Sequence, residues 1–166
     1  MSDLEIIIDR LADSRWKEGR DLRLEALRLE PTAFSSTYDE EVNISKKEWI
    51  IRNRNAFYAF VEDKPVGMIV MILQKDPMTK HIANIFGVYV RKSHRGIGIG
   101  SLLLEQAIQH LSEKEQIVKI KLSVNSEQME AVRLYEKHGF KKVGIQEKEF
   151  YFNDRFYDDL LMELFI

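Results

Sequence analysis

Short apolar segments separated by polar turns run along the whole chain, and their spacing distinguishes strands from helices. Apolar residues that alternate or cluster within a few positions are typical of strands. This pattern predicts strands over residues 4–8, 56–61, 66–73, 81–90, 117–124 and 140–144, and a final hairpin over residues 147–166. Apolar residues that recur every three or four positions indicate helices. They predict helices over residues 13–30, 45–54, 99–111 and 126–138.

Turn and capping residues set several of these boundaries. Pro31 ends the first helix because proline lacks the backbone N–H that a helix interior needs. Ser45 and Glu48 have the spacing of a capping box, Asn125 can cap the helix that follows it, and Asn153-Asp154 marks a hairpin turn. The resulting order, β-α-α-β-β-β-α-β-α-β-β, predicts an α/β chain of the α+β kind. Its mixed sheet carries packed helices, because each element must bury one side.

Composition agrees with an ordinary globular protein and excludes several functional classes. The 166 residues suit one domain over 1–166, with 45% hydrophobic and 31% charged residues. A net charge of -2 gives no overall basic field for nucleic acid, and the apolar runs are too short to cross a membrane. The chain has no cysteine, which excludes disulfides, thiolate metal sites and a cysteine nucleophile. We therefore expect a cytoplasmic protein without a metal and without a nucleic-acid or membrane partner.

A glycine-rich turn between a strand and a helix is the main candidate for a binding site. Gly96, Gly98 and Gly100 follow the strand that ends at Val90, and an amphipathic helix begins directly after them. The first amides of a helix have no partner within it, so this turn can bind an anion such as a phosphate. The spacing fits neither the dinucleotide-binding motif nor the P-loop. An alternative is that the glycines only let the strand and the helix meet closely.

Two motifs resemble the GNAT superfamily of acyl-CoA-dependent N-acyltransferases. The first, Arg-x-x-Gly-x-Gly over residues 95–100, follows a strand that ends Val-Tyr-Val and is similar to the pyrophosphate-binding signature of that family. The second lies over residues 125–140 and is similar to the other wall of the family's acyl-CoA cleft. Its matching residues are Asn125, Ala131, Leu134, Tyr135, Gly139 and Phe140. The order of elements also resembles the GNAT fold over nearly the whole chain.

The resemblance implies a mostly antiparallel central sheet that splays apart between two central strands, with helices on both faces. It implies acetyl-CoA as the co-substrate, with its pantetheine arm paired to the strand near Val88 and Val90 and its diphosphate on the glycine turn. The side chain of Arg95 is expected to add a charged contact to the diphosphate. The expected cofactor-binding residues are Val88, Tyr89, Val90, Arg95, Gly96, Ile97, Gly98, Ile99, Gly100, Ser101 and Asn125.

The implied reaction is direct transfer of an acetyl group to a primary amine through a tetrahedral intermediate. An amide near Val88 is expected to stabilise the oxyanion, and Tyr135 to donate a proton to the departing thiolate. The alternative for Tyr135 is a tyrosine that only packs on the sheet. The general base is open, because Asn84 stands where some family members carry a glutamate. A water chain, or a carboxylate such as Glu40 or Glu41, would have to serve.

Substrate recognition is expected in the loop over residues 31–44 and in the final hairpin. The candidate substrate-binding residues are Phe34, Tyr38, Glu40 and Asn84. Acidic residues near Phe34 favour a small cationic amine such as a polyamine, or an amino-acid-like compound; a merely solvated acidic loop is the alternative. Two other functions stay open: acetylation of a protein N-terminus or lysine, and a non-catalytic acyl-CoA sensor. The aromatic residues over 151–157 would line a pocket, join the core or form a homodimer interface.

Overall fold

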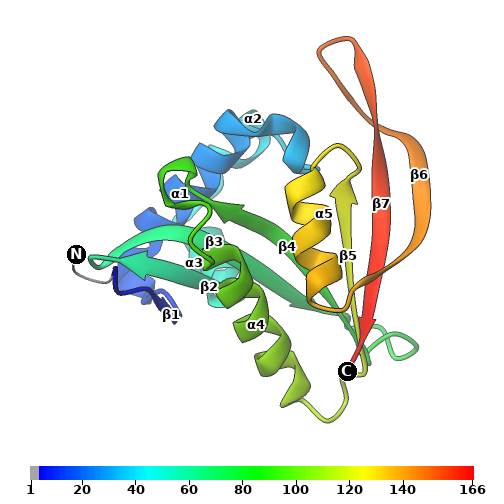
Figure 1. The fold of residues 1–166 in the computed structure, drawn as a ribbon. Coiled ribbons are helices and arrows are strands. Elements are labelled where there is room, and N and C mark those ends of the chain that lie inside the picture. The colour runs from blue at the N-terminus through cyan, green and yellow to red at the C-terminus, as the bar shows by residue number, and fades with distance from the viewer. Residues whose placement is uncertain (1–3) are drawn as a thin grey trace.

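Seven strands form one mixed sheet in the computed structural model, which describes residues 4–166 (Figure 1). The strands pair in the order β1-β2-β3-β4-β5-β7-β6. Their bounds are β1 Ile7–Asp9, β2 Ala56–Val61, β3 Lys64–Leu73, β4 Ile82–Val90, β5 Lys119–Asn125, β6 Lys141–Phe152 and β7 Arg155–Phe165. The helices are α1 Trp16–Leu29, α2 Tyr38–Glu41, α3 Lys46–Arg54, α4 Ile99–Ser112 and α5 Met129–Lys137. This architecture confirms the expected fold.

Three elements differ from the sequence prediction. The first strand covers only Ile7–Asp9. The strand predicted over residues 140–144 and the first arm of the predicted final hairpin form one long strand, β6. Within the loop over residues 31–44, α2 forms a single helical turn. It exists because Thr37 and Glu40 make a complete capping box, in which each side chain bonds the other residue's backbone N–H.

Helices cover both faces of the sheet. In Figure 1, α4 and α5 lie in front of the sheet, and α1 and α3 lie behind it. The front core includes Ile99, Leu103 and Leu104 of α4, and the rear core includes Leu22 and Ala26 of α1. Leu102 of the same helix is 38% exposed and lies outside this core, while Leu104, two positions later, is fully buried.

The two central strands, β4 and β5, pair only at one end. They are parallel, whereas every other described pair of strands is antiparallel. The pairing joins Ile82–Asn84 with Lys119–Lys121 and then stops. Beyond it β4 stays with β3, and β5 stays with β7 as far as Asn125. In Figure 1 the two strands therefore meet near the C-terminus and diverge upward, as the predicted splay requires.

A bulge bends β4 where the two strands part. Met68 of β3 faces Tyr89 and Val70 faces Phe86, so Gly87 and Val88 together stand opposite the single residue Ile69. Gly87 has a φ of +57°, a left-handed conformation that glycine adopts without steric cost. An isolated glycine inside a strand is the sequence signal for such a bulge.

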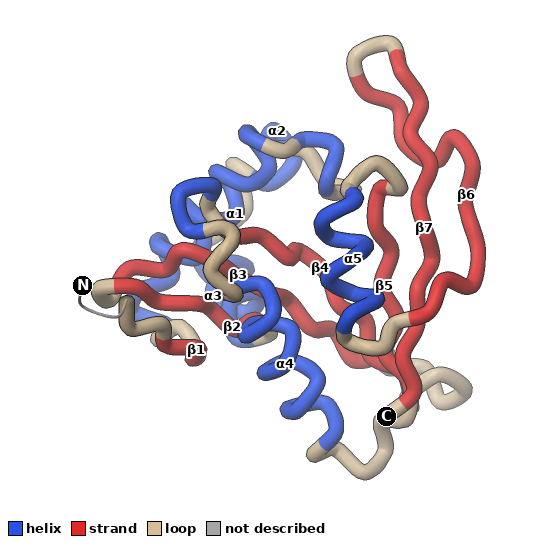
Figure 2. The backbone as a smooth tube through the Cα atoms, viewed as in Figure 1, coloured by secondary structure: helices blue, strands red, loops and turns tan. Residues whose placement is uncertain are grey.

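The final hairpin, β6–β7, projects beyond the rest of the sheet (Figure 2). Its turn at Asn153 and Asp154 is confirmed, since both residues have positive φ. The aromatic residues near the turn are not core residues, because Tyr151 is 61% exposed and Phe156 is 55% exposed. β6 is the outermost strand, and its register shifts twice against β7. A role for this hairpin in a homodimer stays a prediction.

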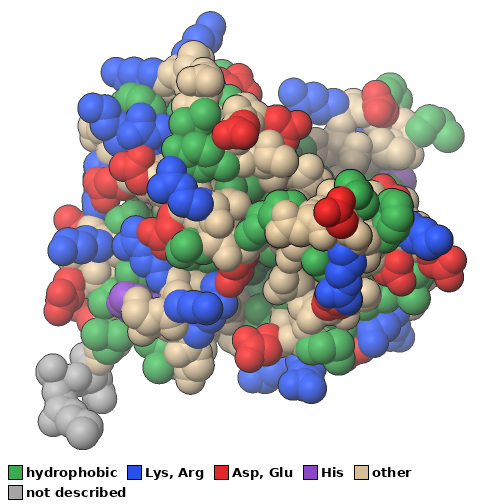
Figure 3. Space-filling view, turned by 90° about the horizontal axis from the view of Figure 1, so that it is seen from above, with side chains coloured by type: hydrophobic (Ala, Val, Ile, Leu, Met, Phe, Trp, Pro, Cys, Tyr) green, Lys and Arg blue, Asp and Glu red, His purple; other side chains and the backbone are tan. Residues whose placement is uncertain are grey.

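Charged groups of both signs are interspersed on the surface. Figure 3 shows the molecule from the open end of the diverging strands, with Lys and Arg beside Asp and Glu over most of this face. Among residues 4–166, no helix is both long enough and apolar enough to cross a membrane.

Two adjacent leucines of α4 offer a direct test of this packing. We expect Leu103→Ala to lower the free energy of unfolding by about 2–5 kcal/mol, because its side chain is fully buried. Leu102→Ala, the same change at the exposed neighbour, should cost less than about 1 kcal/mol. Chemical denaturation of both variants measures the difference. Equal losses would contradict the orientation of α4.

Candidate active site

A cleft of about 320 Å³, which we term the cofactor cleft, lies where β4 and β5 diverge. One wall is β4 from Ile85 to Val90, and the other includes Ser123 and Val124 of β5 and the face of α5 that carries Tyr135. Its end is closed by the turn that leads into α4. The residues expected at the cofactor that line this cleft are Val88, Tyr89, Val90, Arg95, Gly96, Gly98, Ile99, Gly100, Ser101 and Tyr135.

The N-terminus of α4 opens into the cofactor cleft. Gly98 is the N-cap residue, and its carbonyl accepts the first helical hydrogen bond from Leu102 N at 3.1 Å. The amides of Ile99, Gly100 and Ser101 therefore have no partner within the helix. Together with the helix dipole, they make this end of the cleft suitable for an anion.

The glycines of the turn leave room for a large anion. A Cβ atom on Gly96 or Gly98 would meet no protein atom within 4 Å, so both positions border open space. Their φ angles of +78° and +92° also favour glycine. Gly100 has a different role, because a Cβ there would lie 3.2 Å from the Leu134 side chain of α5. These residues fit the diphosphate of coenzyme A.

The side chain of Arg95 is used within the protein rather than offered to a diphosphate. Its Nε donates to the carbonyl of Val90 at 2.7 Å, and its Nη2 donates to Glu30 at 2.6 Å. Glu30 directly follows α1, so this contact ties the end of β4 to the rear helical layer. The expected contact from this side chain to the cofactor stays a prediction, and two of its three nitrogens already have partners in the protein.

Two other expected cofactor residues do not line the cleft. Asn125 is buried at the end of β5, where its Nδ2 donates to the carbonyl of Thr32 at 2.9 Å. Its Oδ1 accepts from Glu127 N at 3.0 Å, so it caps a turn before α5 rather than the helix itself. Ile97 is 50% exposed and lies outside the lining of the cleft. Tyr89 lines the cleft, but its hydroxyl donates to Glu25 of α1 at 3.0 Å.

The segment after α1 bridges the open end of the diverging strands. Glu30 bonds Arg95 beside β4, and the carbonyl of Thr32 accepts from Asn125 of β5. Two residues of one turn, Glu30 and Thr32, are thus connected to the two walls of the cleft. This strap fixes the distance between the walls.

Tyr135 is a buried residue of α5 that lines the cofactor cleft, only 6% exposed. Burial raises the pKa of its hydroxyl above the usual value, so the group is protonated at neutral pH. Its ring packs edge-on against Phe140 at a centroid distance of 5.9 Å, which fixes its orientation. A hydroxyl that stays protonated in this cleft can donate a hydrogen bond, although its raised pKa makes it a weaker acid than an exposed phenol.

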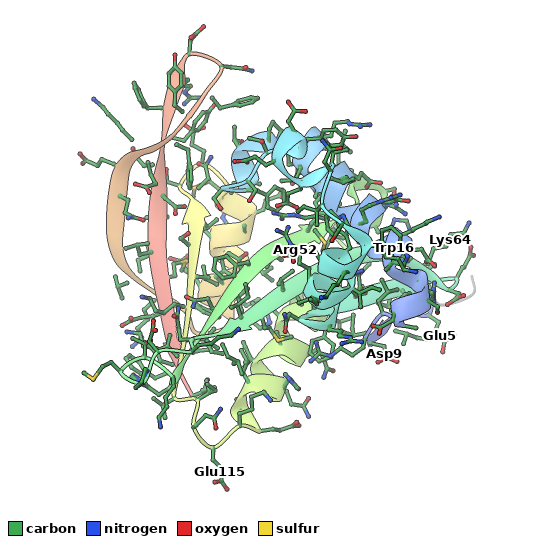
Figure 4. All side chains as sticks on the ribbon, turned by 180° about the vertical axis from the view of Figure 1, so that it is seen from behind. Glu5, Asp9, Trp16, Arg52, Lys64 and Glu115 are labelled. Carbon is green, nitrogen blue, oxygen red and sulfur yellow. The ribbon has the colours of Figure 1, made fainter. Side chains whose placement is uncertain are left out.

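A second hollow, which we term the rear cavity, lies on the face covered by α1 and α3 and has a volume of about 490 Å³. It shares two lining residues with the cofactor cleft, Phe86 and Gly87. The bulge of β4 is thus the junction of the two spaces. In Figure 4, which views this face, Arg52 of the rear cavity lies near the middle and Glu5 and Lys64 lie at the edge. The two spaces therefore have the bulge of β4 as a common wall.

Three of the four expected substrate residues lie outside both spaces. Only Phe34 lines the cofactor cleft. Glu40 bonds its own capping partner, and the ring of Tyr38 lies under Arg28 at 4.4 Å. Asn84 is in the paired section of β4 and β5, at the closed end of the splay. A role for these three residues in substrate binding stays a prediction, and none of them lines either space.

Glu41 lines the rear cavity but is a poor candidate for the general base. Burial alone would raise the pKa of its carboxyl, but hydrogen bonds and charges from Arg23, with a charge from Arg52, outweigh this and lower it. A carboxylate with a lowered pKa accepts a proton from an ammonium group less readily. The sequence analysis did not predict the rear cavity. Gly87 indicates the bulge of β4 that borders this cavity.

A cleft between diverging parallel strands that ends at a glycine-rich helix N-terminus defines the acyl-CoA N-acyltransferase class. The model of the acetyltransferase (GNAT) family matches residues 21–140, which include both motifs and the whole cofactor cleft wall of β4. The chain belongs to this family. Family members use acetyl-CoA.

Two characterised relatives have different acceptors. The chain is 26% identical over 104 residues to an L-amino acid N-acetyltransferase, AaaT, of Escherichia coli, which covers 63% of this chain and 64% of the relative. It is 30% identical over 98 residues to a spermidine N(1)-acetyltransferase of Vibrio cholerae, which covers 59% of this chain and 57% of that one. The matches thus span less than two thirds of either relative.

A solved structure supports the fold over its full length. The GNAT-family acetyltransferase of Streptococcus pneumoniae superimposes with a TM-score of 0.85 at 26% sequence identity. The superposition covers 98% of this chain and 100% of that chain.

A charge placed at Ser101 tests the anion site. We expect Ser101→Asp to weaken coenzyme A binding at least about tenfold, because its carboxylate would oppose the diphosphate. The midpoint of thermal unfolding of Ser101→Asp should stay unchanged or rise, because a negative charge in the first turn of α4 interacts favourably with the helix dipole. Ser101→Asn, a neutral side chain of equal size, is the matched control. Calorimetric titration with coenzyme A measures the affinities, and equal binding by both variants would contradict the site.

Proposed function

We propose that this protein transfers an acetyl group from acetyl-CoA to the primary amine of a small molecule. The observation that carries the proposal is the meeting of two spaces at the bulge of β4. The cofactor cleft fits coenzyme A, and the rear cavity has the size of a small-molecule site. An acceptor in the rear cavity reaches the junction at Phe86 and Gly87 from the side opposite the cofactor.

Backbone groups of the chain hold the donor in this proposal. Amides of residues 96–101 bind the diphosphate, and the cleft-facing edge of β4 beyond Asn84 offers free backbone groups to the pantetheine amides. Acetyl-CoA supplies an activated acetyl group as a thioester. The cleft places this thioester beside Gly87 and Val88, where the bulge directs backbone groups away from the regular ladder.

Two groups of the chain assist the reaction. The Val88 amide donates a hydrogen bond to the carbonyl oxygen as negative charge develops on it. Tyr135 donates a hydrogen bond to the departing sulfur and gives up its proton as the carbon–sulfur bond breaks and negative charge gathers on the sulfur. The acceptor amine, with a pKa near about 10.4 in water, must lose a proton before it attacks. Water takes this proton, since Asn84 cannot and the pKa of Glu41 is lowered.

The shape of the loop over residues 31–44 favours a small acceptor over a protein. Phe34 lines the cofactor cleft, and the next two residues, Ser35 and Ser36, line the rear cavity. The loop therefore lies over the junction, where a peptide acceptor would need an open groove. A protein acceptor and a non-catalytic sensor remain the competing functions.

Thiol release in the presence of acetyl-CoA distinguishes the three functions. We expect turnover with at least one small primary amine from a panel of polyamines and amino acids. Turnover only with peptides would replace the small-molecule acceptor by a protein. An absence of turnover with every amine and peptide, despite binding of coenzyme A, would identify a sensor.

Removal of one hydroxyl tests the role of Tyr135. We expect Tyr135→Phe to reduce kcat about 100-fold or more, since general acids contribute factors of this size. Its affinity for coenzyme A should stay unchanged, because the ring still fills its site. Tyr151→Phe, at an exposed residue of the hairpin, is the control and should retain full kcat. An unchanged kcat for Tyr135→Phe would mean that the thiolate leaves without this acid.

A further inference from the structure

The charged side chains of the rear cavity limit which acceptor it can hold. Four charged residues line it: Arg23, Glu41, Glu48 and Arg52. Glu41 accepts from Arg23 at both oxygens, at 3.0 and 2.8 Å, and lies 3.4 Å from Arg52. Glu48 accepts from Arg52 at 3.3 Å. Both carboxylates are thus paired with an arginine, and the two arginines balance their charge.

The acidic residues that remain do not change this balance. Asp39 and Glu40 are exposed and lie outside the lining of the rear cavity. Glu40 also completes the capping box of α2. A polyamine carries several ammonium groups and needs a free acceptor for each one. Each carboxylate of the rear cavity already pairs with an arginine, so the lining carries no excess negative charge for a polycation.

Arg23 has a part of its guanidinium directed at the junction. Its Nε and Nη2 are occupied by Glu41, which leaves Nη1 on the opposite edge. A Cβ on Gly87 would lie 3.3 Å from this Nη1, so the nitrogen lies against the bulge shared by both spaces. The side chain is 17% exposed, and it stacks over the Phe34 ring at 4.8 Å. It is therefore held in place.

Two nitrogen donors of this region indicate the chemistry of a complementary ligand. Besides Arg23 Nη1, the buried Trp49 Nε1 has no hydrogen-bond partner among the described residues, and Trp49 lines the same cavity. The hydroxyl of Tyr58, by contrast, donates to Asn53 at 2.9 Å. Buried donors without partners cost free energy, so the complementary ligand carries acceptor oxygens.

We propose that the acceptor is a small primary amine that also carries a carboxylate, such as an α-amino acid, and that Arg23 binds this carboxylate at the junction. The proposal rests on the acetyltransferase function proposed above. In an α-amino acid the amine and the carboxylate are attached to one carbon. An oxygen bonded to Arg23 Nη1 therefore places the amine beside Gly87, next to the thioester.

Paired substrates test this choice of acceptor. The panel contains the protein L-amino acids that have a primary amine, each beside the amine left when its carboxylate is removed, together with spermidine. We expect the best amino acid to exceed its decarboxylated amine at least about tenfold in kcat/KM, as a charge-assisted contact predicts. A decarboxylated amine or spermidine that reacts equally well or better would overturn the proposal.

Variants assign the preference to Arg23. The double change Arg23→Gln with Glu41→Gln removes the guanidinium without leaving a buried carboxylate unpaired, and it should abolish the preference through KM. Glu41→Gln alone should retain the preference, since Arg23 stays charged. Arg20→Gln is the same change at another residue of α1, which pairs with Asp21 outside the rear cavity. This variant should also retain the preference for the amino acid. A preference that survives the double change would overturn the role of Arg23.

A binding measurement separates this proposal from the acetyltransferase function. Calorimetric titration of the same amino acids and amines, in the presence of coenzyme A, needs no turnover. Tighter binding of a carboxylate-bearing compound that the double variant loses would support the rear site, even if no amine is acetylated. Absence of such binding in a chain that does acetylate amines would overturn the proposal and leave the transferase intact.

Discussion

The partial pairing of β4 with β5 is the constraint on which the rest of the structure depends. Three residue pairs join the two parallel strands, and then each strand follows its other neighbour. The divergence exposes one backbone edge of β4 and opens the cofactor cleft, which α5 covers. The N-terminus of α4 lies at the end of this cleft. The strap formed by Glu30 and Thr32 limits how far the strands part. A full-length pairing would close the cleft and bury its backbone groups in the sheet.

Local patterns in the sequence were sufficient for most of the fold and for the anion site. Strand periodicity, the stop at Pro31 and the turn at Asn153-Asp154 act over a few residues, and they located the described elements apart from the short first strand and the continuous β6. The glycine turn was recognisable for the same reason. Its chemistry comes from backbone amides and from the absence of side chains at Gly96 and Gly98, which the sequence states directly.

Side-chain partners far apart in the chain were not predictable in this way. Arg95 was assigned to the cofactor from its place in a motif, but its guanidinium bonds Glu30, which is 65 positions earlier. Asn84 and Glu40 were assigned from spacing and charge, and the register of β4 and the cap of α2 place both elsewhere. The proposed role of Arg23 could not be predicted from the sequence, because it depends on the contact of this α1 residue with the bulge of β4. Only the folded arrangement shows which charges are already neutralised.

The outermost strand, β6, has a consequence for how copies of this protein behave at high concentration. An unpaired strand edge of this length can template the stacking of further chains into fibrils. Here lysines and glutamates are spaced along the edge, and Lys148 has a φ of +54° that breaks the straight row of free amides. The charged side chains, which lose hydration when another strand pairs beside them, and this kink both oppose edge-to-edge stacking, so the projecting hairpin is a poor seed for aggregates.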